Sequence, residues 1–321
     1  MKLQENIFQI ESDEQFEQVA LQIFRRQAVS CRAYRSYIAQ IEVDPLQVKH
    51  LEQIPFLPIG MFKTHEIYCG ETPPEQVFTS SATTSMTSSR HPMQSLALYE
   101  EAFTRAFEAF YGEPSEWSLY ALLPNYLRRK GSSLVYMADR LIKTCGSGGF
   151  YLDDYEKLLA DMARDPRPKI LLGVSYALWD LVERYAPKLH QTIVMETGGM
   201  KGYREEISKE EFHRILCEGF GVEQIHSEYG MAELTSQAYS HGQNRFYTPS
   251  WMRVLVRDIN DPFAVLAQGA RGGLNIVDLA NYWSCAFIQT EDAGRVFEDR
   301  SFEIEGRIAQ SDIRGCNLLV Q

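Results

Sequence analysis

The residues with the clearest chemical potential form a run of hydroxyl side chains at positions 79–90. Nine of these twelve residues carry a hydroxyl, and the run leads toward a predicted helix near Pro92. Hydroxyls and backbone N–H groups before a helix N-terminus suit a polyphosphate, because both donate hydrogen bonds to anionic oxygens. A flexible polar linker has the same composition. Composition alone favours the linker, but Val77 and Phe78 indicate a core strand before the run, which argues against it, so both interpretations stay open.

Two further motifs place charged or aromatic side chains where strands should end. In residues 227–233, Glu233 could hold a divalent cation that bridges phosphate oxygens, and Tyr229 could stack on a base. Further along, Asp292 could accept hydrogen bonds from both hydroxyls of a ribose, and Arg307 could neutralise phosphate. Each residue also has a purely structural interpretation, since carboxylates cap strand-to-helix turns and exposed ion pairs are common on protein surfaces.

These motifs require a scaffold, and a predicted parallel sheet in the middle of the chain supplies it. Two runs of strand length, 169–173 and 191–196, and a possible third strand at 224–228 alternate with helical patterns that Ser175 and Ser208 are predicted to cap. This β-α-β-α-β order favours a largely parallel sheet covered by helices. Because ligands bind at the carboxyl ends of the strands in such sheets, we expect the binding edge in the loops that follow the last two strands.

Other parts of the chain are predicted to flank this sheet. A capping box that begins at Ser12 precedes one helix, and Pro92 is a favoured first-turn residue for another. After about residue 245, short strand-like runs between Gly and Asp turns predict a smaller β-rich lobe. We therefore expect an α/β region at residues 1–245, to which the family resemblance given below assigns nucleotide and acyl binding, and a β-rich lobe at residues 246–321, packed on it within the same structural unit.

The composition of the 321 residues excludes several classes of protein. Apolar residues make up 45% and charged residues 23%, as in ordinary globular proteins. The net charge of -11 argues against a nucleic-acid or anionic-membrane partner, because binding to either needs a basic face. No apolar stretch approaches membrane-spanning length, and the six cysteines lack the spacing of a zinc site or a disulfide framework. A cytoplasmic location is therefore expected.

Together the motifs resemble those of the adenylate-forming superfamily of acyl-CoA ligases, luciferases and peptide-synthetase adenylation domains. That superfamily has a Ser/Thr/Gly-rich loop, then a Tyr-Gly-x-x-Glu motif, then an Asp, then Gly-Arg. Within it, the sequence is similar in particular to the LuxE-type acyl-protein synthetases of bacterial fatty-acid reductase complexes. The segments that carry this resemblance are Phe78–Ser81, Leu123–Pro124, Ser132–Leu134, Glu196–Gly202, Tyr229–Met231, Glu233–Leu234 and Arg314–Cys316.

The resemblance implies a fold, a reaction and a set of site residues. The fold would be the N-terminal-domain architecture of adenylate-forming enzymes, with the C-terminal lid domain absent. ATP and Mg²⁺ would be the cofactors, and a carboxylic acid, a fatty acid in the LuxE-type proteins, would attack the α-phosphorus to give an acyl-adenylate. The implied ATP-binding residues are Ser80, Ser81, Thr83, Thr84, Gly198, Gly199, Tyr229, Gly230, Met231, Asp292 and Arg307, with Glu233 holding Mg²⁺.

The resemblance also implies an acceptor for the acyl group. Cys316 stands where the LuxE-type proteins carry the acyl group as a thioester, next to Arg314, whose charge would favour the thiolate. Arg307 is the second catalytic candidate. A small apolar residue in a last strand is the alternative role for Cys316. A reductase or an acyl-carrier protein would be the protein partner.

Three positions depart from the superfamily pattern. Ala82 and Ser85 stand where the phosphate loop has glycines, no lysine follows, and Ala232 replaces a threonine that contacts the α-phosphate. Because glycine permits the positive-φ conformations that wrap amides around a phosphate, these replacements predict weaker phosphate contacts. Two alternatives therefore stand beside an acyl-protein synthetase. One is a non-catalytic nucleotide- or acyl-binding relative, and the other is a ligase that passes the acyl group to coenzyme A or a carrier protein.

Overall fold

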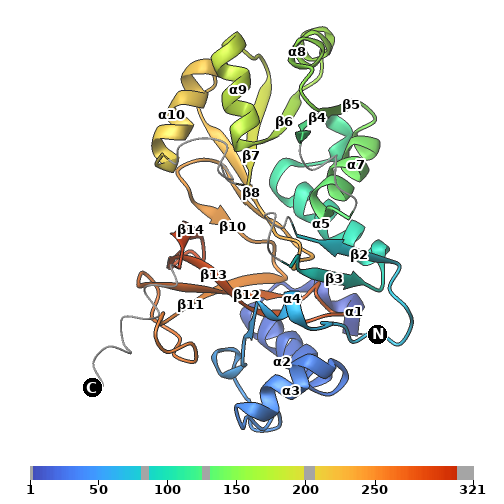
Figure 1. Ribbon diagram of the computed structural model, residues 1–321, viewed down its shortest axis with the longest axis vertical. Helices are drawn as coiled ribbons and strands as arrows, with labels where there is room; N and C mark the ends of the chain where they lie inside the picture. The colour runs from blue at the N-terminus through green and yellow to red at the C-terminus, as the bar shows by residue number, and fades with distance from the viewer. Residues whose placement is uncertain (1–2, 81–86, 125–130, 199–206, 309–321) are drawn as a thin grey trace. The chain divides into compact units, whose positions relative to one another are not determined.

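The computed structural model describes residues 3–80, 87–124, 131–198 and 207–308 (Figure 1). The chain divides into two compact units. Unit 1 comprises Met1–Ala102, Ala232–Ser236 and Tyr247–Gln321, and unit 2 comprises Phe103–Met231 and Gln237–Phe246. The expected domain boundary between residues 245 and 246 remains a prediction. Among the described residues, no helix has both the length and the apolar character that crossing a membrane requires.

Unit 2 is a sheet covered by helices. Its strands are β4 (Ser118–Leu122), β5 (Gly148–Tyr151), β6 (Lys169–Val174), β7 (Thr192–Thr197), β8 (Ile225–Tyr229) and β9 (Ala238–Ser240). Their spatial order is β9-β8-β7-β6-β4-β5, and the pairs are parallel except for β8 with β9. Its helices are α7 (Ser133–Cys145), α8 (Tyr155–Arg164), α9 (Ser175–Tyr185), α10 (Lys209–Phe220), the short 3-10 helix η3 (Pro114–Glu116) and the second half of α5 (Leu96–Tyr111). The predicted β-α-β-α-β order is confirmed by β6, α9, β7, α10 and β8.

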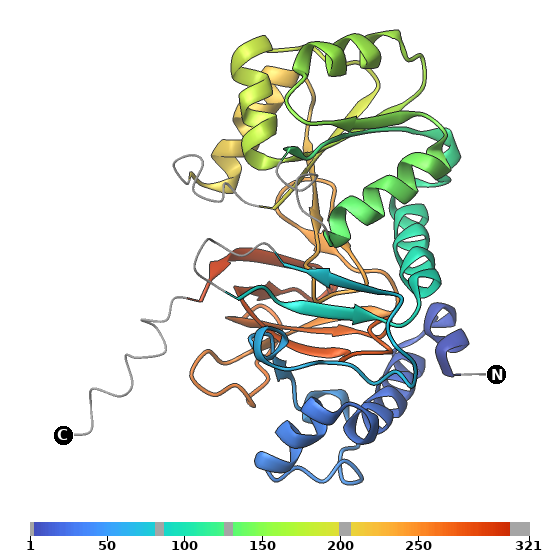
Figure 2. The same ribbon diagram turned by 45° about the vertical axis from the view of Figure 1, so that its right-hand side comes forward.

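Local sequence explains how these elements form. Every residue of β6 is buried, as expected of a parallel strand with both faces covered. Ser208 Oγ accepts a hydrogen bond from the Glu211 N–H (3.2 Å) and so caps α10, as predicted. Gly221 ends the same helix in the left-handed conformation at φ 71°. Helices α9 and α10 lie on one face of the sheet and α7 lies on the other (Figures 1 and 2).

Unit 1 is built on antiparallel strands. The strands are β11 (Met252–Arg257), β12 (Arg271–Asp278), β13 (Phe287–Val296) and β14 (Phe302–Arg307), in that spatial order. The short strand β1 (Leu57–Pro58) pairs with β13 in parallel, and β2 (Gln76–Thr79) pairs with β3 (Arg90–Met93) as a separate two-stranded sheet. The helices are α1 (Leu3–Asn6), η1 (Ile7–Gln9), α2 (Asp13–Ser30), α3 (Arg32–Gln40), η2 (Leu51–Gln53) and α4 (Met61–Thr64), and β10 (Phe246–Tyr247) lies at the boundary of the units. The β-rich character predicted for the last part of the chain is present in β11 to β14.

The core of unit 1 centres on the aromatic ring of Phe287. Its ring centroid lies 6.0 Å from that of Phe24 and 6.2 Å from that of Phe56, both in edge-to-face contact. The buried amide of Gln27 bridges α2 to the start of β13, because its Oε1 accepts a hydrogen bond from the Ala286 N–H (2.9 Å). The first half of α5 also belongs to this unit. The core therefore fixes the position of β13, which carries Asp292 further along.

Two expected helix starts are wrong. Pro92 lies in the hairpin strand β3, where a residue without an N–H is tolerated because the two-stranded sheet has free edges, and the helix that follows begins at Leu96. Ser175 is the first residue of α9 rather than its cap. Its hydroxyl instead contacts Glu196 Oε2 (3.2 Å) and the Gly198 carbonyl O (2.8 Å). The Ser175 hydroxyl therefore interacts with the Glu196 carboxylate and the Gly198 carbonyl and does not cap the N–H groups of α9.

Candidate functional site

In unit 1, Glu233 lies in a turn that hydrogen bonds hold in place. His91 Nδ1 contacts the carbonyl O of Ala232 (2.8 Å), and Asn281 Nδ2 donates to the carbonyl O of Glu233 (2.8 Å). The buried carboxylate of Asp278 accepts two backbone N–H groups from further along the turn, at 2.8 Å each. The turn leads into β9, so the interpretation of Glu233 as the cap of a following helix is wrong.

The buried imidazole of His91 holds this turn in its neutral form. Burial lowers the pKa of His91 to about 4, so the ring carries no charge near neutral pH. A carbonyl oxygen only accepts hydrogen bonds, so Nδ1 must carry the proton that faces Ala232. His91 Nε2 then accepts from the hydroxyl of Ser284, 2.8 Å away. The ring therefore supports the turn without adding charge beside Glu233.

The carboxyl group of Glu233 is 5% exposed. Burial raises its pKa, while the positive charges of Lys63 and Arg307 act in the opposite direction. Among the described residues, no group of three or more His, Cys, Asp and Glu side chains could hold a metal ion. A single buried carboxylate nevertheless fits Mg²⁺, because this ion is commonly bound by one or two carboxylates together with the phosphates of a substrate.

Asp292 and Arg307 face each other on two paired strands. The register of β13 and β14 places them as direct partners, and Arg307 Nε lies 3.9 Å from Asp292 Oδ1. The sequence pattern predicts Asp292 after a strand end, but it lies within β13, next to a register irregularity at Ala293 and Gly294. The Asp292 side chain is 15% exposed and that of Arg307 is 80% exposed. The guanidinium can therefore reach a solvent-side phosphate while staying beside the carboxylate.

The hydroxyl-rich run joins the two strands of a hairpin. Ser80 N–H donates to the Ser89 carbonyl O (3.2 Å), and Ser89 N–H donates to Ser80 Oγ (2.9 Å), which closes the base of the loop. The run leads into β3 and not directly into a helix, so the expected contribution of a helix dipole is wrong. Any anion bound here would be held by hydroxyls and backbone N–H groups of the loop.

In unit 2, the residues expected around adenine lie at the carboxyl ends of neighbouring strands. Thr197 of β7 is the register partner of Glu228 of β8, so Gly198 and Tyr229 follow side by side. The Tyr229 ring meets the Phe246 ring edge-on, with centroids 6.0 Å apart. Gly230 and Met231 continue the chain away from this edge. This is the edge that the parallel order predicts for ligand binding.

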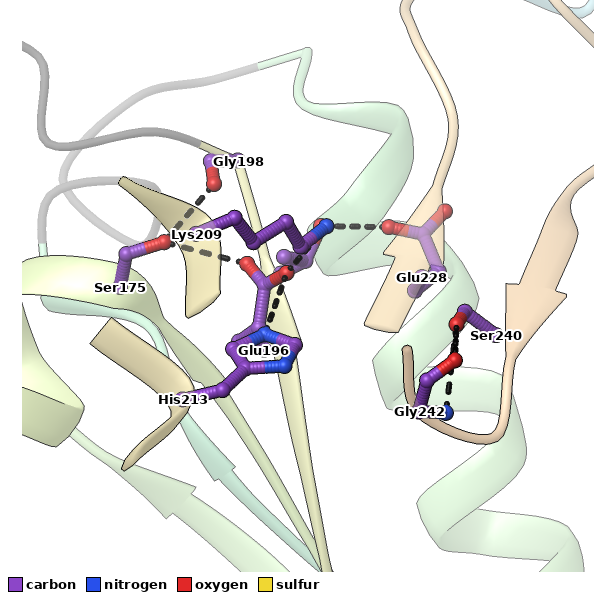
Figure 3. A network of polar contacts seen from close by, with 9 residues as sticks. Ser175, Glu196, Gly198, Lys209, His213, Glu228, Ser240 and Gly242 are labelled. Carbon is purple, nitrogen blue, oxygen red and sulfur yellow. Dashed lines mark hydrogen bonds and ion pairs between the residues drawn. The ribbon is translucent and has the colours of Figure 1, made fainter. Parts of the chain in front are cut away.

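A buried ionic network lies at the same edge (Figure 3). Glu196 Oε1 lies 3.0 Å from Lys209 Nζ and 3.6 Å from His213 Nε2, both on α10, and Oε2 contacts the Ser175 hydroxyl. Burial alone would favour the neutral acid, but Lys209 and His213 hold the pKa of Glu196 down to about 2. Glu196 is therefore ionised, and it ties β7 to α10.

Glu228 is the second buried carboxyl of this edge, and its charge state differs. Burial raises its pKa to about 7, and the nearby negative charge of Glu196 adds to this effect. The Thr197 hydroxyl donates to Glu228 Oε2 and partly opposes it. Because Glu196 and Ser227 are register partners, as are Thr197 and Glu228, the two carboxyls point to opposite faces of the sheet. One group is ionised and the other titrates near neutral pH.

Sequence reasoning assigned no role to Glu228, Lys209 or His213, and it used Glu196 only as part of a motif. A signal was present for the carboxyls, because each stands at the end of a segment that the sequence predicts as a strand of the parallel sheet. Lys209 and His213 are four residues apart, which places both on one face of a helix. The role of His91 could not be predicted from the sequence, because its hydrogen-bond partners, Ala232 and Ser284, are far from it in the chain.

The predicted site residues thus fall into two groups within the described part of the chain. Unit 1 contains Ser80, Glu233, Asp292 and Arg307, and unit 2 contains Gly198, Tyr229, Gly230 and Met231. Arg307 interacts with two members of the first group: its positive charge lowers the pKa of Glu233, and it forms an ion pair with Asp292. Ser81, Thr83, Thr84, Gly199 and Cys316 lie outside the described residues. All assignments of ligand contacts stay predictions.

Comparison with solved structures shows where this architecture is found. An open conformation of 2-hydroxyisobutyryl-CoA ligase, solved with 2-HIB-AMP and CoA, matches with a TM-score of 0.67 at 13% identity over 95% of this chain and 78% of that chain. ATP-bound MatB from Rhodopseudomonas palustris matches with a TM-score of 0.55 at 17% identity over 72% of this chain and 47% of that chain. The chain has the fold of the adenylate-forming ligases. The predicted α/β architecture is therefore confirmed, and the expected absence of a C-terminal lid domain stays a prediction.

Sequence comparison points in the same direction. No family model matches the chain. A long-chain-fatty-acid–luciferin-component ligase from Vibrio harveyi is 26% identical over 187 residues, which cover 51% of this chain and 48% of the ligase. The chain thus spans about half the length of the curated relative it matches. The resemblance that the motifs indicated, to the adenylate-forming superfamily and within it to the LuxE-type acyl-protein synthetases, is confirmed as a resemblance by these two kinds of match.

Proposed function

We propose that this protein uses ATP to activate a carboxylic acid as an acyl-adenylate. The observation that carries the proposal is the group formed by Glu233, Asp292 and Arg307 in a chain with the fold of adenylate-forming ligases. A carboxylate oxygen of the acid would attack the α-phosphorus of ATP. The bond from that phosphorus to the oxygen bridging to the β-phosphate breaks, and pyrophosphate leaves with its electrons. Catalysis of this kind consists mainly of positioning and neutralisation of charge.

Glu233, Asp292 and Arg307 of unit 1 would each have a role in this reaction. Glu233 would hold Mg²⁺, which would supply positive charge at the phosphate oxygens. Asp292 would accept hydrogen bonds from the ribose hydroxyls. The exposed guanidinium of Arg307 would neutralise phosphate charge and, through its pairing with Asp292, orient that carboxylate. The unit 2 residues Gly198 and Tyr229 would contact adenine.

The substrate and the acceptor form the finer part of the proposal. The match to a long-chain-fatty-acid–luciferin-component ligase supports a fatty acid as the substrate. We place the acyl group next on a thiol, with Cys316 as acceptor, and a reductase or acyl-carrier protein as the partner that receives it. The thiolate sulfur would attack the acyl carbon, and AMP would leave with the electrons of the broken acyl–phosphate bond.

Acid-dependent exchange of labelled pyrophosphate into ATP tests the first step. The wild-type protein should catalyse exchange with a long-chain fatty acid and none without an acid. Glu233→Gln should lower the exchange rate by about 100-fold or more, the effect of removing one group that stabilises transition-state charge. Glu298→Gln, an exposed carboxylate in the turn between β13 and β14, is the matched control and should exchange normally. Absence of exchange with every acid chain length would favour the non-catalytic, nucleotide-binding alternative.

Transfer to a thiol is tested separately with radiolabelled fatty acid and ATP. Label should remain on the denatured wild-type protein, should be released by hydroxylamine, and should be absent from Cys316→Ser. Cys217→Ser is the control, because Cys217 is the described cysteine with a partly exposed position. Label that persists on Cys316→Ser would exclude this acceptor. Label that leaves the protein only when coenzyme A is added would identify an ordinary acid–thiol ligase.

A further inference from the structure

A cavity lies in unit 1, and its lining includes none of the residues proposed for the nucleotide. It is a cavity of about 460 Å³ between residues 41–56, the central strand β12 and the loop at residues 262–265. Most of its wall is apolar. The side chains that matter here are Ile41, Val43, Glu52, Phe56, Phe263 and Asn275. Phe263 is 57% exposed, so an aromatic ring stands at the mouth.

The buried polar side chain that lines this cavity is Asn275. It lies in the middle of β12, between Leu255 of β11 and Gln289 of β13, and it is 1% exposed. Among the described residues, none supplies a hydrogen-bond partner for its Oδ1. A buried carbonyl oxygen that has lost its hydrogen bonds to water and has no donor in the protein destabilises the folded state. An apolar residue at this position would avoid that cost, so the amide is suited to a donor from outside the chain.

The lining also restricts the charge of the occupant. Among the described residues that line the cavity, Glu52 carries the only formal charge, and it is negative. An anionic ligand such as a free carboxylate would be repelled there, so this cavity is unsuited to the acid substrate proposed above. The volume is within the range of small-molecule sites, which are mostly apolar with a few placed polar groups.

We propose that this cavity binds a small, uncharged hydrophobic molecule that presents a hydroxyl or N–H donor to Asn275 Oδ1. The apolar walls would hold the body of the molecule, and the buried, unpaired Oδ1 of Asn275 would fix its orientation. A site with a placed acceptor rejects an analogue that lacks the donor, because the acceptor is then left unpaired. The proposal is independent of acid activation, since it concerns binding alone.

Calorimetric titration with indole and N-methylindole tests the proposal on the full chain. The two probes are nearly equal in size and both uncharged, but only indole has an N–H donor. Indole should bind wild-type protein at least tenfold more tightly than N-methylindole. Asn275→Leu should lose this preference while its melting temperature stays equal or rises, because the variant removes an unpaired polar atom. Equal affinity of the two probes for the wild-type protein would overturn the proposal, as would no binding of indole at all.

A cavity-filling variant provides a second test that does not depend on the folding of Asn275→Leu. Val43→Trp should abolish binding of indole by occupying the cavity. Val29→Trp is the matched control, because Val29 is 68% exposed on α2 and is not among the lining residues. Unchanged indole binding to Val43→Trp would place the probe elsewhere and refute the site. The titration measures indole binding and not pyrophosphate exchange. A negative result would therefore refute the cavity proposal without bearing on the proposed acid activation.

Discussion

At the scale of single residues, the two buried carboxyls at the edge of the unit 2 sheet differ in charge because their partners differ. Glu196 has a cation and an imidazole at its oxygens and is ionised, whereas Glu228 has a hydroxyl and titrates near pH 7. Because the two side chains point to opposite faces of the sheet, each takes its charge state from the partners on its own face. Their pKa values lead to a direct prediction about stability.

Glu228→Gln should change how stability depends on pH. The folded pKa of about 7 lies above the ordinary value of 4.5, so the folded state binds a proton that the unfolded state releases between these two values. The contribution of Glu228 to the wild-type free energy of unfolding should therefore fall as pH rises from 4.5 to 7, by about 3 kcal/mol at most, relative to the variant at the same pH. Glutamine cannot ionise, so the variant should lack this fall. Urea unfolding at pH 5 and pH 8 measures the difference.

The Glu196 carboxyl does not interfere with that measurement. Its pKa of about 2 lies below the ordinary value of 4.5, so the stability it contributes is present above pH 4.5 and is lost only as pH falls toward 2. The two windows are separate. If wild-type and Glu228→Gln protein lose stability equally between pH 5 and pH 8, Glu228 is ionised throughout and its assignment is wrong.

Arg307 should matter for activity and little for stability. Its side chain is 80% exposed and its contact with Asp292 is long, so removing it should change the free energy of unfolding by less than about 1 kcal/mol. Arg307→Ala should lower pyrophosphate exchange at least tenfold at limiting ATP. Arg271→Ala, another exposed arginine paired with a carboxylate, is the control. Equal activity of the two variants would remove Arg307 from the site.

At the scale of elements, helix α10 positions the ionic network of unit 2. Its cap Ser208 precedes Lys209 directly, so the first turn of the helix sets the distance from Lys209 to Glu196. Ser208→Ala should cost about 1 kcal/mol of stability. Ser12→Ala removes the equivalent cap of α2 and should cost a similar amount. Only Ser208→Ala should also weaken ATP binding, measured by titration calorimetry; a similar loss in both variants would exclude a local role of α10.

Strand β13 has a comparable role in unit 1, and Gly294 is its most constrained position. A Cβ at this residue would overlap the backbone carbonyl O of Glu303 on β14, so the two strands could not keep their distance. Gly294→Ala should destabilise the protein by about 1–3 kcal/mol and reduce exchange activity, because β14 carries Arg307. Gly60→Ala is the control, since a Cβ added there would have no atom within 4 Å. Thermal unfolding of both variants tests this.

Features that depend on residues close together in the sequence could be predicted. Features that depend on contacts between residues far apart in the sequence could not. The cap at Ser208 was predictable because its partner is three residues away. Ser175 was not, because the carboxylate that takes its hydroxyl lies on another strand. Glu233 and Asp292 were found through motif order, whereas the support of the Glu233 turn by His91 depends on pairing across the unit. The unpaired amide of Asn275 was equally invisible in a strand pattern.

At the scale of the whole molecule, the chain enters unit 2 at Phe103, leaves it for Ala232–Ser236 and completes it before residue 247. Residues 103–246 contain all of unit 2 and, in addition, only the short piece Ala232–Ser236 of unit 1. A fragment of residues 103–246 should therefore fold and unfold in one cooperative transition, since compact units with their own core can fold alone. Circular dichroism during heating measures this. A fragment of residues 103–231 lacks β9, leaves the edge of β8 uncovered and should aggregate.

The pairing of β1 with β13 has a consequence for how the protein is made. Leu57 is the register partner of Ile288, so the strand near the start of the chain stays unpaired until the ribosome has translated nearly all of the described sequence. Unit 2 is complete well before that moment, and domains tend to fold in the order of their synthesis. The apolar face of the N-terminal helices that packs on β13 therefore stays exposed to solvent until β13 has been translated. Chaperone dependence of this protein should reside in residues 3–102.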